Sequence, residues 1–569
     1  MAEKCFIKEH LWLVKDDLDV NSCIIKSQVN ADSQQIRNIK DSLNSSDIDE
    51  QENGLDILAY ALKNCDLKYL ELNIVDWLRA LLHNFINNNG SPFKLKAKSL
   101  NVAALLFYQL NAIPTVKAQI KKDYTNSIFE TVLNLKSTRC SIAQLIFLRT
   151  VLSVFPHSIG NLKMKMEKFT LNFLKNEKPQ PEVVYEAAKT LPYVLAMGSV
   201  SGSSGNPENT FAKLYFRMCC RLLVTCHKLL DFLIMDEYKG KEIEKELDAQ
   251  PILEGIPDMN GSSAKKPRRY EDDDELTPTK AAVYFEIMIF TLRQLLTTPT
   301  KNQVEIPVTP IIELLNRIVN FCAFSKEELL PHIDGNLTWN HIVYYATLVL
   351  ESLTKSCKET TVSRYKNFLD IYIYLLEETT NYRSKQNNGI IRKTAYAGLE
   401  ALLKNCSAIQ PHADNKTIVK ILKFAIIDCK EDCRQGDASK PPVFNFERNE
   451  CSKVACLRVL ITYVLNYGKH ISGENFQSLL SFLFEKIFQV QMDLKKNNFN
   501  NSSFSYSVNY RYSLYNLLKI CILNCSFDLD PPINYSAVAF RQGLLDPNQM
   551  IADLSKEAIS LCSILSNCQ

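Results

Sequence analysis

Helical spacing of apolar residues recurs along almost the whole chain, and it constrains the fold more than any other feature of the sequence. The segment LNIVDWLRALLHNF, residues 72–85, carries its apolar side chains at the spacing of one continuous helical face. The segment KVACLRVLITYVLNYG, residues 453–468, is apolar over a wider arc. Because a helix that is apolar over so much of its circumference must be covered on more than one side, the pattern predicts stacked helices.

We expect roughly eighteen such helices, mostly about 12–20 residues long and joined by short polar links. The one alternating stretch, SFSYSVNYRY at residues 503–512, fits a strand or a loop that enters a helix. Helices in series without strand pairing favour an all-α fold, an irregular HEAT- or armadillo-like α-solenoid, because no repeat period holds strictly. The alternative architecture is two separate helical bundles.

Two segments interrupt the helical pattern and predict the domain organisation. Residues 238–276 and, on a smaller scale, residues 430–448 lose apolar spacing and gain proline, glycine and charge. We therefore expect an N-terminal helical-repeat region at 1–237, a flexible charged excursion at 238–276 and a C-terminal helical-repeat region at 277–569, with a smaller loop near 430–448.

Local signals mark several expected helix ends. Thr277-Pro278 and Thr309-Pro310 each pair an N-cap residue with proline at the first helical position, and Ser325 begins a capping box. Gly468 stands where a helix C-cap is expected.

Composition excludes several classes of protein. Only 16 of the 569 residues are glycine, and no cluster has the spacing of a phosphate loop or a dinucleotide-binding turn. The net charge of +3 is too small for a protein that coats nucleic acid, so we expect little direct RNA contact. No secretory signal and no membrane-spanning run is evident, and the 18 scattered cysteines read as reduced core residues, which indicates the nucleus or the cytosol.

The sequence gives no pattern typical of an enzyme. It has no HExxH, GxSxG or CxxC motif, and Cys429 and Cys433 have no partner pair at zinc-site spacing. The eight histidines are dispersed. We therefore expect no catalytic residue, no metal site and no cofactor.

Four expected helices carry the pattern LxxLL. On a helix the three leucines share one face, which can dock in a partner's hydrophobic groove but is also what an ordinary core-facing helix presents. Exposure of the leucines in the folded protein distinguishes the two interpretations. The residues are Leu78, Leu81 and Leu82, Leu292, Leu295 and Leu296, Leu399, Leu402 and Leu403, and Leu514, Leu517 and Leu518.

A compact basic cluster lies inside the 238–276 excursion. Lys265, Lys266, Arg268 and Arg269 surround a proline that keeps the chain extended, a pattern typical of a nuclear import signal. The acidic run that follows, residues 271–275, precedes the helix start at Thr277, where negative charge is favourable. That electrostatic account leaves the basic residues unexplained, so we predict that they direct nuclear import.

An ordered set of segments resembles a known family. Residues 155–174 and 183–198 look like the paired-helix core of the Rix-type pre-rRNA-processing domain. Residues 304–321 are similar to the corresponding segment of its animal members, the proline-, glutamic acid- and leucine-rich proteins, also described as modulators of nongenomic estrogen receptor activity. The resemblance continues in order through 390–406, 454–487, 510–525 and 539–565. The acidic C-terminal tail usual in the animal members is lacking in this sequence.

This resemblance implies a non-enzymatic scaffold of the nucleolus and nucleoplasm, which acts in maturation of the large (60S) ribosomal subunit and in removal of the internal spacer from its pre-rRNA. The implied partners are a WD-repeat β-propeller subunit and a second helical-repeat subunit, with a SUMO protease, a nuclease-associated factor and an AAA-type ATPase on pre-60S particles. Two alternatives stay open: a transcriptional coregulator that docks through LxxLL helices, and a HEAT-type nuclear transport adaptor.

Overall fold

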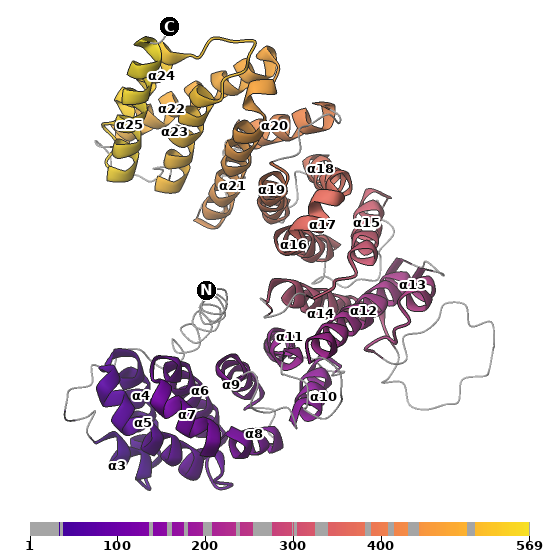
Figure 1. Cartoon of the computed structure of the whole chain (residues 1–569), viewed down its shortest axis with the longest axis vertical. Coiled ribbons are helices and arrows are strands. Elements are labelled where there is room, and N and C mark those ends of the chain that lie inside the picture. Colours follow the sequence, from indigo (N-terminus) through magenta and orange to yellow (C-terminus); the bar gives the residue numbers. More distant parts are fainter. Residues whose placement is uncertain are drawn as a thin grey trace. The chain divides into compact units, whose positions relative to one another are not determined.

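The computed structural model describes most of the chain. The described residues are 34, 38–123, 125–135, 140–155, 162–175, 180–196, 207–234, 239–253, 276–298, 300, 304–324, 339–381, 388–407, 415–430, 443–497 and 507–567. Every element that these residues form is a helix (Figure 1). The all-α class predicted from the sequence is therefore confirmed.

The chain divides into two compact units, and each is described by itself. Unit 1 comprises Met1–Ile311 and unit 2 comprises Ile312–Gln569, so the division falls inside helix α15. The α-helices of unit 1 are α3 (Ile39–Asn44), α4 (Ile48–Asn64), α5 (Leu67–Leu81), α6 (Phe93–Gln109), α7 (Pro114–Asp123), α8 (Thr125–Asn134), α9 (Ser141–Val154), α10 (Lys163–Leu174), α11 (Pro181–Leu195), α12 (Pro207–Ile234), α13 (Lys239–Leu247) and α14 (Pro278–Thr297). A π-helical turn, η1 (Leu82–Ile86), extends α5.

Unit 2 is likewise helical throughout its described residues. Its α-helices, beginning with the one that crosses the division, are α15 (Val308–Phe324), α16 (Trp339–Ser356), α17 (Lys358–Ser363), α18 (Tyr365–Asn381), α19 (Asn388–Asn405), α20 (Asn415–Lys430), α21 (Val443–Tyr467), α22 (Gly473–Asn497), α23 (Val508–Leu523), α24 (Ile533–Gly543) and α25 (Gln549–Asn567).

The described residues form twenty-three α-helices, α3 to α25, more than the roughly eighteen expected. Several of the additional helices are short. The helices α3 and α17 have six residues each and α13 has nine, which is too short for an apolar period to stand out in the sequence. The count was therefore too low, although the fold class was right.

Helices of unit 1 stack in two rows. In the first row α4, α6, α9, α11 and α14 pack successively against one another, and the second row supplies partners to them, such as α5 to α6, α10 to α11 and α12 to α14. Forty-three buried apolar side chains between Ile39 and Val194 form one continuous core cluster between these helices.

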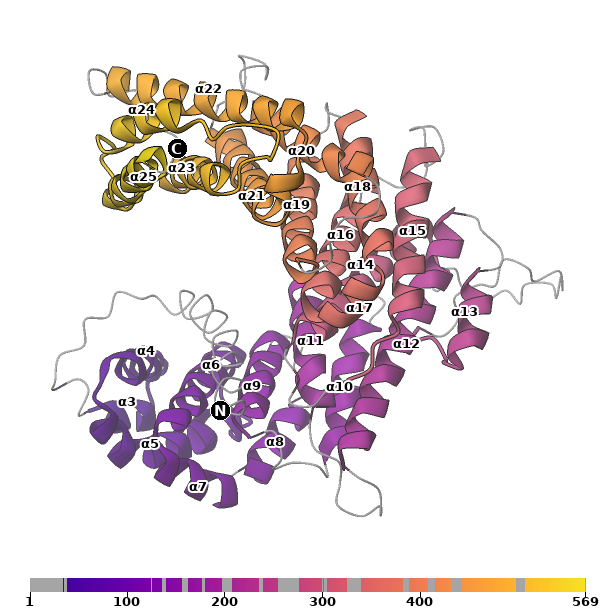
Figure 2. The same cartoon turned by 45° about the horizontal axis from the view of Figure 1, so that its top comes forward.

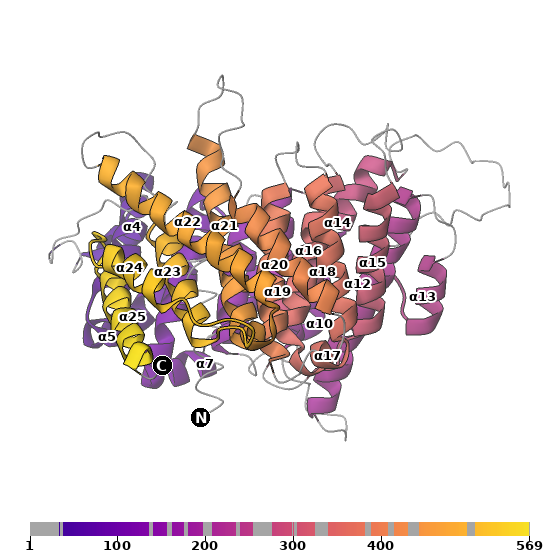
Figure 3. The same cartoon turned by 90° about the horizontal axis from the view of Figure 1, so that it is seen from above.

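The stack in unit 2 follows the same plan. Its first row is α16, α19, α21, α23 and α25, and its second row is α18, α20, α22 and α24. Each second-row helix pairs with the first-row helix that follows it, so the C-terminal pairs α22–α23 and α24–α25 lie with α22 and α24 on one side (Figure 2). Contacts join α20 to both α21 and α22, and the three helices can be followed in the view from above (Figure 3). Stacked helix pairs are the arrangement of a HEAT-like α-solenoid, as the sequence predicts.

Local signals account for several helix ends. Thr277 is the N-cap of α14, and its side chain accepts a hydrogen bond from the Lys280 amide at 3.2 Å. Ser507 caps α23 in the same way through the Tyr510 amide, so the described part of the alternating stretch, residues 507–512, begins a helix. The helix α15 instead begins at Val308, one residue before Thr309.

Gly468 directly follows the end of α21, as predicted, but its role is steric. A side chain at this position would overlap the backbone oxygen of Asn524, in the turn after α23. Glycine is required here by the close approach of two chain segments.

The structure also moves two predicted boundaries. Residues 239–253 of the predicted 238–276 excursion form α13 and a following turn, in which Ile243 and Ile252 are buried. Ile243 packs on Cys220 and Val224 of α12, and the Ile252 amide donates to Thr225 Oγ1 of the same helix. The sequence pattern does not reveal this packing, because charged residues surround Ile243. The last part of the predicted 430–448 loop, from Val443 onward, belongs to α21. The three-part domain division itself stays a prediction.

Candidate interaction surface

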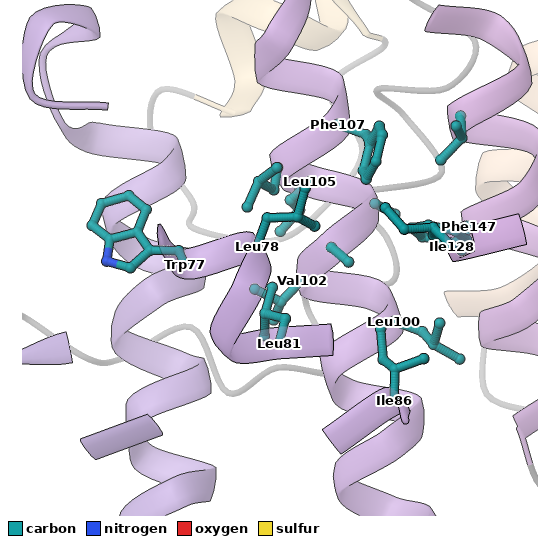
Figure 4. Packing of buried hydrophobic residues seen from close by; sticks show 14 of the residues in the cluster. Trp77, Leu78, Leu81, Ile86, Leu100, Val102, Leu105, Phe107, Ile128 and Phe147 are labelled. Carbon is teal, nitrogen blue, oxygen red and sulfur yellow. The ribbon is translucent and has the colours of Figure 1, made fainter. Parts of the chain in front are cut away.

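The LxxLL leucines lie in the core of the stacked helices. Leu78 and Leu81 belong to the core cluster of unit 1 (Figure 4), and Leu82 is partly buried against the same cluster. The leucines of the other three motifs are at most 4% exposed, namely Leu292, Leu295, Leu296, Leu399, Leu402, Leu403, Leu514, Leu517 and Leu518. The docking hypothesis is wrong for the folded chain, because these side chains already fill the space between helices.

The basic cluster of Lys265, Lys266, Arg268 and Arg269 lies outside the described residues, as does Cys433. The import signal predicted from these four residues therefore stays a prediction.

Burial governs the chemistry of the described cysteines. It raises the pKa of the Cys357 and Cys406 thiols to about 11, and it raises the pKa of Cys226 and Cys521 further. These thiols stay protonated at neutral pH and act as small packing residues.

Among the described residues, no three His, Cys, Asp or Glu side chains are grouped to hold a metal ion. No helix within the described ranges is long and apolar enough to cross a bilayer.

A buried polar network joins three helices of unit 2. The Arg392 guanidinium on α19 donates from Nε and Nη2 to the Asp428 carboxylate on α20, at 2.8 and 2.6 Å. It also donates to the Leu376 carbonyl oxygen and to Thr379 Oγ1 on α18, at 2.7 and 2.8 Å. Tyr396 donates its hydroxyl to the same Asp428 carboxylate. The network thus fixes α18, α19 and α20 against one another.

Electrostatics within this network favour a charged arginine. Burial by itself lowers the pKa of Arg392, but Tyr396 and Asp428 more than offset it, so the pKa of Arg392 is raised. Burial, followed by the nearby Cys456 and Asp428, raises the pKa of Tyr396 well above its ordinary value. At physiological pH the network therefore contains the Arg392–Asp428 ion pair and a neutral Tyr396 hydroxyl.

Further polar contacts hold successive first-row helices of unit 2 in register. Asn405 donates to the Thr354 carbonyl oxygen at 2.8 Å, which ties α19 to α16. Asn466 donates to the Leu403 carbonyl oxygen at 2.7 Å, which ties α21 to α19. At the C-terminal end, Lys519 of α23 pairs with a glutamate of α25 at 2.7 Å. Side-chain bonds to fixed backbone groups favour one orientation of each pair and stiffen the stack.

Unit 1 has comparable contacts between its first-row helices. Lys98 on α6 pairs with Asp56 on α4 at 2.8 Å, and Arg149 on α9 pairs with Glu186 on α11 at 3.1 Å. Most of these groups are buried or half-buried, so each pair is geometrically constrained. Both units are thus built as stiff helical stacks, which suits a protein that holds partners at fixed positions.

Exposed apolar side chains concentrate near the C-terminal end of the described residues. Nineteen large apolar side chains of the described residues are exposed, and twelve of them lie between Leu465 and Ile564. Where exposed apolar side chains are contiguous, they mark an interaction surface more often than an ordinary solvent face. The sequence does not predict these exposed residues, because helical spacing does not reveal which apolar residues neighbouring helices leave uncovered.

The sequence is similar to two curated vertebrate proteins. It is 22% identical over 553 residues to proline-, glutamic acid- and leucine-rich protein 1 of Xenopus laevis, and 23% identical over 564 residues to the protein of that name from Mus musculus. Both matches cover 90% of this chain, but 51% and 47% of the relatives. The chain therefore spans about half the length of the curated relatives it matches. No protein-family model matches the sequence.

Two solved structures share the fold. A chain described as body 3 of the Rix1 subcomplex in a Rix1–Rea1 pre-60S particle matches with a TM-score of 0.53 and 12% identity, over 96% of both chains. Yeast importin-beta (Kap95p) matches with a TM-score of 0.53 and 11% identity, over 94% of this chain and 58% of its own. At such low identity these likenesses establish the helical-repeat fold alone.

Proposed function

We propose that this chain, which resembles the proline-, glutamic acid- and leucine-rich proteins over most of its length, acts as a non-enzymatic scaffold subunit in nuclear maturation of the large ribosomal subunit. The observation that carries the proposal is the extent of the similarity. It covers 90% of this chain in both curated relatives, and the Rix1-subcomplex chain shares the fold over 96% of both lengths.

The mechanism of such a scaffold is geometric. Two stacks of paired helices, each held by buried ion pairs and side-chain bonds to backbone oxygens, present partner surfaces at fixed positions within each unit. We propose the partners implied by the family: a WD-repeat β-propeller, a second helical-repeat subunit and, on pre-60S particles, the protease, nuclease-associated and ATPase factors. The finer role is support for removal of the internal spacer from pre-rRNA in the nucleolus and nucleoplasm.

The experiment that tests this function is recovery of the tagged chain from nuclear extract together with precursor rRNA of the large subunit. Transport factors without precursor rRNA would favour the alternative of a HEAT-type transport adaptor, which shares the fold.

Nuclear import through the basic cluster belongs to the same proposal. We expect residues 258–280, fused to a cytosolic fluorescent reporter, to move the reporter into the nucleus, because Lys265, Lys266, Arg268 and Arg269 supply the charge that import receptors bind. The matched control is the same fusion with all four residues changed to alanine, observed by fluorescence microscopy. A reporter that stays cytosolic when it carries the unchanged segment would show that residues 258–280 are not a sufficient import signal.

A further inference from the structure

Two neighbouring second-row helices of unit 2 expose apolar side chains where solvent would favour polar ones. Tyr535 and Leu545, on and just after α24, are 72% and 73% exposed, and Met492 on α22 is 56% exposed. Phe488 on α22 and Val538 on α24 are exposed as well. We call these five residues the α22/α24 surface.

The two apolar stripes lie side by side. The rings of Phe484 on α22 and Tyr535 on α24 are 6.2 Å apart between centroids. Eleven residues further along α22, Lys495 Nζ donates to Gln542 Oε1 of α24 at 3.2 Å. Phe488 and Met492 follow Phe484 at four-residue spacing, so on α22 they lie between these two contacts. We infer that the exposed apolar residues of α22 and α24 border one another along this helix pair.

Apolar exposure is not a general property of this row of helices. In the preceding second-row helix, α20, the residues whose side chains are described include exposed lysines at 420, 423 and 430 and one exposed large apolar residue, Ile427. Lys420 forms an ion pair with Glu377 of α18, with 2.6 Å between Nζ and Oε1. A change from a charged face on α20 to an apolar face on α22 and α24 indicates that the latter is suited to a protein partner.

Charges around the α22/α24 surface are distributed unequally. Lys495 and Arg541 are exposed at the end where α22 meets Gln542. Asp546, the acidic residue nearest to Leu545 in sequence, is buried and makes a two-point ion pair with Arg511 of α23, at 2.9 and 3.0 Å. The exposed carboxylate of Glu485 lies toward the opposite end, near Phe484. At the Lys495 end, Lys495 and Arg541 outnumber the single carboxylate of Asp493, so this end carries a net positive charge.

We propose that the α22/α24 surface binds an amphipathic helix of a partner protein, whose apolar stripe covers Met492, Val538 and Leu545 and whose carboxylates face Lys495 and Arg541. An apolar helical stripe fits a shallow two-helix surface, and complementary charge at one end sets its direction. The proposal goes beyond the scaffold function and is tested on the purified chain without any ribosomal component. A negative result for peptide binding therefore leaves the scaffold function untouched, and the reverse also holds.

The test uses fluorescence anisotropy with two labelled synthetic peptides of about eighteen residues, or five helical turns. Both carry the same leucine and phenylalanine stripe, and the other positions are glutamate in one peptide and lysine in the other. We expect the acidic peptide to bind at least about tenfold more tightly than the basic one. We expect V538S/L545S to weaken binding of the acidic peptide by about tenfold. We expect K495E/R541E to remove the preference for the acidic peptide.

The matched control is K423E on α20, which changes a charge on a neighbouring exposed face and should leave both affinities unchanged. Circular dichroism of each variant verifies that the helices are retained. Equal binding of the two peptides, absence of binding, or binding unaffected by V538S/L545S would overturn the proposal. Light scattering that shows a dimer of the chain, converted to monomer by V538S/L545S, would also overturn it by assigning the surface to a second copy.

Discussion

Replacement of Arg392 by methionine is expected to lower the free energy of unfolding of unit 2 by about 3–5 kcal/mol. The substitution keeps much of the side-chain volume but leaves the partly buried Asp428 carboxylate without its cation, and it removes donors from the Leu376 carbonyl oxygen and Thr379. For a unit of this size, such a loss corresponds to a fall in melting temperature on the order of 6–20 °C. Thermal unfolding followed by circular dichroism measures it.

Two companion variants separate the buried charge from ordinary loss of contacts. The double variant R392M/D428L removes both charges, so it should recover most of the stability lost in R392M. The exposed pair of Lys404 and Glu400, also on α19, provides the matched control, and K404A should cost no more than about 0.5 kcal/mol. If the double variant is as unstable as R392M, the ion pair does not account for the effect.

Truncation of Leu402 to alanine is expected to cost about 2–5 kcal/mol, because this leucine of the third LxxLL motif has no exposed surface and its removal leaves a cavity. Leu402 lies on α19, which packs between α16 and α21 in the first row of unit 2. Equilibrium unfolding by urea measures the change.

Ile427 on α20 gives a control for this truncation, because it is an apolar residue that is 40% exposed. The I427A variant should change stability by about 0.5 kcal/mol or less. A Leu402 variant as stable as the unchanged chain would mean that the leucine is not a core residue, and the docking interpretation of LxxLL would then return.

Periodicity alone predicted the fold class, because every stacked helix must bury an apolar face. It could not assign the LxxLL motifs, since Leu399, Leu402 and Leu403 have the same spacing whether they meet a core or a partner. Only the neighbouring helices decide that. Short helices such as α17, with the sequence KETTVS, were missed because six mostly polar residues carry no period.

The interaction surface and the buried network could not be predicted, for a different reason. Arg392 and Asp428 are 36 residues apart, and nothing in either local sequence pairs them. Likewise Phe488 and Val538 look like core residues in the sequence. They are exposed because they lie on faces of α22 and α24 that the contact between these two helices does not cover. The family resemblance, by contrast, was predictable, because it depended on the order of many segments rather than on any one of them.

Affinity purification of the tagged chain from nuclear extract at moderate salt, with mass spectrometry of the proteins and sequencing of the RNA, tests whether the chain is a scaffold of large-subunit maturation. We expect recovery of a WD-repeat subunit and a second helical-repeat subunit, together with precursor rRNA of the large ribosomal subunit that retains its internal spacer. Recovery of transport factors or nuclear-receptor complexes without that precursor would mean that the chain does not have this function.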